Sequence, residues 1–170
     1  MHLFVIYIGG AHSQSLIELH DMRFVAANCI EDTYDALRKS WWGVPKSLHV
    51  DAWGILDYAD GHSIHIADHP PVNPANKLFF LNLGGYDHQQ FTELHKNVFV
   101  VAADEKQALQ KAVQQIKEWQ SPHRDYLYQV DSILDLNALL ASEKIYVHLA
   151  TSDAKPFEFT CHYTPIGRVK

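Results

Sequence analysis

Two short stretches of the sequence place a glutamate two residues before a histidine. Glu18 and His20 form the first pair, and Glu93 and His95 form the second. Both pairs fall in runs that we expect to be strands, where residues two apart point to the same face. A carboxylate beside an imidazole can bind a metal or act as an acid–base pair. Brought together, the four side chains would offer enough ligands for Zn, Fe or Mn.

A structural role explains the same pairs, and from the sequence alone we favour it. In that role each pair hydrogen-bonds a strand end or the glycines that precede it. The presence of the pair in both stretches fits this role better, because a constraint of the fold applies to each stretch separately. Asp51 and Asp131 are candidates for a third ligand, although an Asx turn or a cap is the simpler role for each.

Two glycine pairs, Gly9–Gly10 and Gly84–Gly85, end the apolar runs that precede the Glu–His pairs. Neither is followed by the glycine spacing of a dinucleotide fingerprint or by the lysine of a phosphate-binding loop. We therefore predict a structural turn or a close backbone approach at these glycines, and favour the turn over an anion nest.

Both stretches belong to a longer internal repeat. Leu3–Ala27 aligns without a gap on Leu78–Ala102, and 11 of these 25 positions are identical. Farther along, the letters HVDA at His49–Ala52 correspond to QVDS at Gln129–Ser132. Self-similarity of this kind indicates a tandem duplication.

Each copy predicts a ββαββ unit, and the two copies are expected to pack about a pseudo-twofold axis. The fold class is thus α+β, with one helix per repeat on mainly antiparallel sheet. In the first copy an apolar stripe predicts the helix, and its residues are Ile30, Tyr34, Leu37 and Trp41. In the second copy Asp104 and Gln107 suit a capping box. A short helical turn is expected near residues 136–144. The predicted divisions are a first repeat at 1–67, a Pro-rich joint at 68–76, a second repeat at 77–150 and a C-terminal extension with an extra strand at 151–170.

The same motifs carry a family resemblance. The shared pattern is a Gly-Gly pair, the letters ELH, a following FV, a helix and then VD. With this pattern the chain resembles an uncharacterised bacterial family, domain of unknown function 1543, whose members carry one or two copies. The matching residues are Gly9, Gly10, Glu18, His20, Phe24 and Asp51, and then Gly84, Gly85, Glu93, His95, Phe99 and Asp131. The resemblance covers Leu3 to about Leu149 and implies an architecture, but no activity, cofactor or catalytic residue.

Composition limits the class of function. A net charge of −6 with 14 basic residues argues against a nucleic-acid partner, which requires a basic face. The apolar N-terminus is too short for a membrane span, and the isolated Cys29 and Cys161 suit buried or half-buried thiols in a reducing cytoplasm.

We expect a small binding or interaction protein, with a homodimer through the C-terminal strand as one arrangement, and lean away from an enzyme. The alternative is a small metal-dependent or acid–base enzyme whose site lies at the repeat interface and uses Glu18, His20, Glu93 and His95.

Overall fold

The protein has a mixed α+β fold with mainly antiparallel sheets, as the sequence predicts. The computed structural model describes residues 1–86, 89–114, 121–122 and 133–168. The chain divides into two compact units. Unit 1 comprises Met1–Tyr58 and Lys155–Lys170, and unit 2 comprises Ala59–Ala154.

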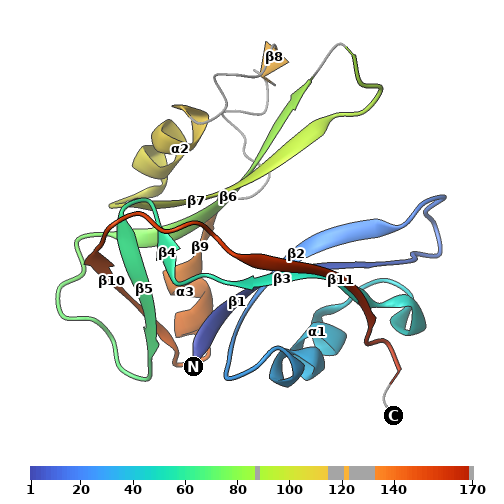
Figure 1. Cartoon of the computed structure of the whole chain (residues 1–170), viewed down its shortest axis with the longest axis horizontal. Helices are drawn as coiled ribbons and strands as arrows, with labels where there is room; N and C mark the ends of the chain where they lie inside the picture. Colours follow the sequence, from blue (N-terminus) through green and yellow to red (C-terminus); the bar gives the residue numbers. More distant parts are fainter. Residues whose placement is uncertain (87–88, 115–120, 123–132, 169–170) are drawn as a thin grey trace. The chain divides into compact units, whose positions relative to one another are not determined.

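Unit 1 is built on one sheet in the order β11-β3-β1-β2 (Figure 1). Its elements are β1 (His2–Gly10), β2 (Leu19–Ala27), a 3₁₀ turn (Glu31–Thr33), α1 (Tyr34–Ser40), a second 3₁₀ turn (Pro45–Ser47), β3 (His49–Ile55) and β11 (Phe159–Pro165). Alternate residues of β1 face the core on the α1 side, where Ile6 and Ile8 pack with Leu37 and Trp41. The predicted apolar stripe packs in the core, but α1 itself carries only Tyr34 and Leu37 of it. Ile30 and Trp41 lie just outside the helix.

The other face of β1 presents Tyr7 and Gly9 near the end of the strand. The neighbouring strand β3 has a bulge at this level: Ile8 pairs with Val50, whereas Tyr7 pairs with Ala52. Asp51 is the extra residue between these two pairs. His49 and Asp51 are two residues apart and point to the same face, so the bulge lies directly beside them. Bulges are common beside functional sites.

Unit 2 contains the counterpart of the β1–β2 hairpin. Its elements are β4 (Tyr58–Ala59), β5 (His62–Ala67), β6 (Lys77–Tyr86), β7 (Leu94–Ala102), α2 (Glu105–Gln114), β8 (Ser121–Pro122), β9 (Ile133–Asp135), α3 (Leu136–Ala141) and β10 (Tyr146–Thr151). In the first hairpin Gly9 pairs with His20, and in the second Gly84 pairs with His95, so both have the same register at an offset of 75 residues. Equal register supports the repeat over these hairpins.

The helices of unit 2 lie where the sequence predicts them. The backbone N–H of Gln107 donates to Asp104 Oδ1 at 2.8 Å, as in a capping box. The helical turn expected near residues 136–144 is α3, whose N-terminus is capped by Asp135. In the described residues no helix is long and apolar enough to cross a membrane.

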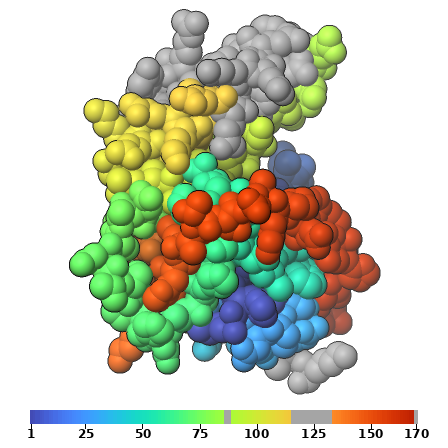
Figure 2. Space-filling model, turned by 60° about the vertical axis from the view of Figure 1, so that its left-hand side comes forward, coloured from blue at the N-terminus to red at the C-terminus, as the bar shows by residue number. Residues whose placement is uncertain are grey.

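The compact units do not follow the limits of the sequence repeats. Strand β5, which the sequence assigns to the first repeat, pairs with β10 in unit 2. The C-terminal strand β11 pairs with β3 in unit 1, within the same chain. Figure 2 shows this C-terminal segment, in red, at the surface beside turquoise residues of the β3 region. Strand β11 thus completes the sheet that carries the site described below.

Two local expectations are corrected. Gly9 and Gly10 lie within β1, and Gly84 and Gly85 lie within β6, so neither pair forms the predicted turn. The alternative expectation, a close backbone approach, describes them better. Cys29 and Cys161 are exposed rather than buried.

Candidate metal centre

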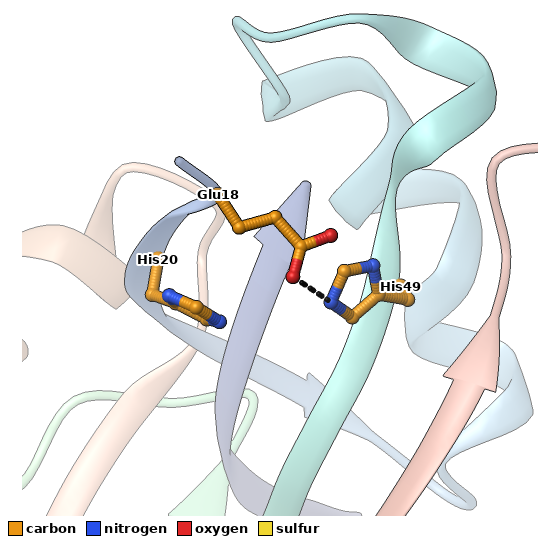
Figure 3. A group of neighbouring side chains, drawn as sticks. All are labelled: Glu18, His20 and His49. Carbon is orange, nitrogen blue, oxygen red and sulfur yellow. Dashed lines mark ion pairs between the residues drawn. The ribbon is translucent and has the colours of Figure 1, made fainter. Parts of the chain in front are cut away.

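Three side chains of unit 1 converge on the face of the sheet opposite α1. Donor atoms of Glu18, His20 and His49 all lie within 4.8 Å of one another. Figure 3 shows the carboxylate and the two imidazole rings turned toward each other. His20 comes from β2 and His49 is the first residue of β3, and both are cross-strand partners of Gly9 in the intervening strand β1. Sheet pairing alone therefore brings the two histidines together.

Gly9 provides the space in which these side chains meet. A Cβ atom at this position would lie 2.7 Å from His20 Cδ2 and 2.7 Å from His49 Nε2, and 2.9 Å from Asp51 Oδ2. Any side chain at position 9 would thus occupy the centre of the cluster. The glycine is required by close approach and not by an unusual backbone angle, because its φ is not positive.

Asp51 is the fourth member of the cluster. Its Oδ2 atom lies 3.3 Å from His20 Nε2 and 3.4 Å from His49 Nε2. This oxygen is buried and accepts no hydrogen bond from the described residues. A buried carboxylate oxygen without a partner is costly, so its position between two imidazole nitrogens requires an explanation. Asp51 follows His49 by two residues on β3, so both side chains point to the same face of the sheet.

The spacing of the donor atoms suits a small metal ion. Four ligands at about 2.1 Å from a tetrahedral ion are separated from one another by about 3.4 Å. The His20–Asp51 and His49–Asp51 distances, 3.3 and 3.4 Å, match this separation. The distance from His49 Nε2 to Glu18 Oε2 is somewhat longer, at 3.8 Å.

His49 is held in one orientation by its second ring nitrogen. Nδ1 lies 2.8 Å from the carbonyl oxygen of Ser47. A carbonyl can only accept, so Nδ1 carries a hydrogen and Nε2 is directed at the cluster. The Ser47 hydroxyl in turn donates to the carbonyl of Val44. A histidine that donates its outer N–H to a backbone carbonyl is typical of metal ligation.

Two tyrosines border the cluster. The Tyr7 ring stacks on His20 with a centroid distance of 5.2 Å, and the Tyr163 ring of β11 lies 4.5 Å from His49. Burial raises the pKa of the Tyr7 phenol, and the carboxylates of Asp51 and Asp21 raise it further. Tyr7 is therefore a neutral phenol at physiological pH.

The second Glu–His pair has different surroundings. His95 Nε2 lies 3.6 Å from Glu93 Oε2, and His95 Nδ1 contacts Asn82 Oδ1 at 2.9 Å. Asn82, which stands at the position of Tyr7 in the repeat, also donates to Asn97. This pair is thus part of an amide network within unit 2. Asp131, the other predicted ligand, lies outside the described residues, as does Gln129.

The sequence prediction found part of this cluster. It singled out Glu18, His20 and Asp51, which the structure brings together, but it did not single out His49. Its alternative interpretation joined both Glu–His pairs at the repeat interface, and Glu93 and His95 belong to unit 2. The available signal was the first of the two differences between HVDA and QVDS, which puts a histidine in one stretch and a glutamine in the other.

Comparison with known proteins agrees with this architecture. The crystal structure of a protein Il1583 from Idiomarina loihiensis is similar over 97% of both chains, with a TM-score of 0.73 and 28% sequence identity. No curated protein matches the chain. Residues 15–66 match the family model described as Domain of Unknown Function (DUF1543), and this stretch contains Glu18, His20, His49 and Asp51. This match confirms the predicted family resemblance over one copy of the domain.

Proposed function

We propose that unit 1 is a metal-binding domain that holds one divalent transition-metal ion through His20, His49 and Asp51, with Glu18 beside it. One observation carries the proposal: Asp51 Oδ2 is buried, accepts no hydrogen bond from the described residues and lies between two imidazole nitrogens. A metal ion at this point would satisfy all three atoms at once.

A purely structural role accounts for this arrangement less well. With its hydrogen on Nδ1, a neutral His49 directs a lone pair of Nε2 toward the carboxylate of Asp51. Two electron-pair donors 3.4 Å apart repel each other unless a cation or a proton lies between them. A proton there would make the imidazole of His49, which is 1% exposed, a buried cation. A metal ion supplies the positive charge and leaves the imidazole neutral.

The ligand types favour zinc. Imidazole nitrogen combined with carboxylate oxygen suits zinc, and sites of two histidines and one carboxylate also occur with iron. The 3.3 and 3.4 Å separations match the tetrahedral geometry that zinc adopts. Magnesium and calcium prefer ligand sets made of oxygen atoms.

We infer a tandem duplication in which only the first copy binds metal. The equal registers of the two hairpins support the duplication. The amide network around His95 and the glutamine at position 129 support the loss of the site from the second copy. The expected stoichiometry is therefore one ion per chain.

Zinc titration of metal-free protein by calorimetry tests this function. We expect one site per chain, no comparable heat with magnesium, and a rise in melting temperature with zinc because the ion binds only the folded state. A chain without a tag avoids added histidines. If zinc adds neither heat nor thermal stability, the metal-binding function is wrong.

We also propose a cytoplasmic homodimer. The unpaired, exposed cysteines favour a reducing compartment. Strand β11 ends the sheet order of unit 1, and an edge strand can pair with a second copy. Light scattering would then give twice the 19.4 kDa mass of the chain, and a mass of one chain would contradict the dimer.

A further inference from the structure

We propose that the metal site of unit 1 is catalytic and hydrolyses neutral carboxylic esters, with Glu18 as the general base. This inference rests on the proposed metal site and adds a reaction and a substrate class to it. It depends on how the four donors differ in exposure, spacing and position in the chain.

Glu18 differs from the other three donors. Its side chain is 50% exposed, whereas those of His20, Asp51 and His49 are 35%, 28% and 1% exposed. It also has the longest separation, 3.8 Å from His49 Nε2. It precedes β2, so sheet pairing does not fix its backbone as it fixes that of His20.

The difference in exposure between Glu18 and the other three donors matches a catalytic metal site better than a structural one. Structural zinc sites are closed by four ligands, whereas catalytic sites have three protein ligands and an open position for water. His20, His49 and Asp51 would supply the three ligands, and the open position would lie on the exposed side, where Glu18 stands (Figure 3). A carboxylate at that place can accept a proton from the bound water.

Local charge selects the class of substrate. A divalent ion beside Glu18 and Asp51 gives a centre with no net charge. The guanidinium of Arg23, which follows on β2, is bound by Asp21 and by the carbonyl of Met22. Such a centre offers no excess positive charge that would select an anionic phosphate ester over a neutral ester. A neutral ester is compatible with it.

The surroundings of the centre favour an apolar substituent on the ester. Tyr163 beside His49 is exposed, and the hairpin loop directly before Glu18 presents Leu16 and Ile17 to solvent. Exposed apolar side chains beside a polar centre are typical of ligand-binding surfaces.

The proposed step is a hydrolysis without redox change. Glu18 accepts a proton from the water that the ion polarises, and the water oxygen forms a bond to the carbonyl carbon of the ester. The bond between that carbon and the alcohol oxygen then breaks. The proton on Glu18 passes to the departing alcohol oxygen, which leaves Glu18 ionised and gives one carboxylic acid and one alcohol.

Hydrolysis of p-nitrophenyl butyrate by zinc-loaded protein tests the inference. We expect saturable turnover that disappears when zinc is removed and returns when it is added. Glu18→Gln should lower kcat by about 100-fold or more, as expected for the loss of a general base, while the protein still binds one zinc ion. The matched control is Glu93→Gln, the corresponding change in unit 2, which should leave both kcat and zinc content unchanged.

The possible failures are distinguishable. Zinc-loaded protein that hydrolyses the ester no faster than zinc-free protein would overturn the catalytic inference and leave the metal site in place. Full activity in Glu18→Gln, or loss of zinc from that variant, would overturn the role of Glu18 as a base. Failure of the wild-type chain to bind zinc would overturn the proposed metal site and the catalysis together.

Discussion

His49→Ala is expected to reduce bound zinc from one ion per chain to background. His49 is the most enclosed of the donors, and its Nδ1 is held by the Ser47 carbonyl. Loss of an outer partner of this kind typically weakens metal binding by about 10–100-fold, and loss of the ligand itself should cost more. Elemental analysis of untagged protein after exposure to zinc and desalting measures the effect.

Two further variants separate ligand loss from misfolding. His20→Ala removes a more exposed donor and should also abolish zinc binding, so it serves as a second test should His49→Ala fold poorly. His95→Ala changes the corresponding histidine of unit 2 and should keep one zinc ion per chain. Retention of zinc by folded His49→Ala and His20→Ala would contradict the site.

Gly9→Ala is expected to abolish zinc binding and also to destabilise the fold. The added methyl group would lie within 2.9 Å of atoms of His20, His49 and Asp51, all of which are held by β2 or β3. Overpacking of this kind typically costs about 1–3 kcal/mol of the free energy of unfolding. Denaturant unfolding and zinc titration measure the two effects.

Gly84→Ala provides a matched control in the second hairpin. Its methyl group would lie 2.6 Å from Glu93 Oε1, at the end of a long side chain that can move aside. Alanine is also intrinsically more favourable than glycine in a strand, by about 0.5–1 kcal/mol. We therefore expect a nearly neutral change and unaltered zinc binding. Equal effects of the two substitutions would show that Gly9 has no special role.

Those parts of the fold that depend on local sequence patterns could be predicted. Short apolar runs that end in Gly-Gly identify the first strand of each hairpin. The sequence repeat relates the two hairpins, in which Gly9–His20 and Gly84–His95 are equivalent pairs. The Asp104–Gln107 contact likewise depends on residues three apart. These features require no knowledge of distant contacts.

The part of the site that could not be predicted depends on strand order. His49 approaches His20 only because β3 pairs with the other side of β1, and periodicity does not reveal such an order. Once His49 is placed, Asp51 follows on the same face two residues later, but the position of β3 beside β1 could not be read from HVDA. The glycines were interpreted as a turn because the sequence does not show that Gly9 lies beneath three side chains.

Local sequence patterns also could not predict that the compact units differ from the sequence repeats in the strands they contain. The sequence groups β5 with the first repeat, whereas β5 pairs with β10. Strand β11, which has no counterpart in the first repeat, completes the sheet of unit 1 and places Tyr163 beside His49. Such long-range pairings are determined by the burial of whole surfaces and not by neighbouring residues.

Anomalous X-ray scattering at the zinc edge, from crystals grown with zinc, tests the central claim most directly. We predict one strong peak per chain, at about 2.1 Å from His20 Nε2, His49 Nε2 and Asp51 Oδ2. A peak at Glu93 and His95 instead, or no peak among the three predicted donors, would contradict the account.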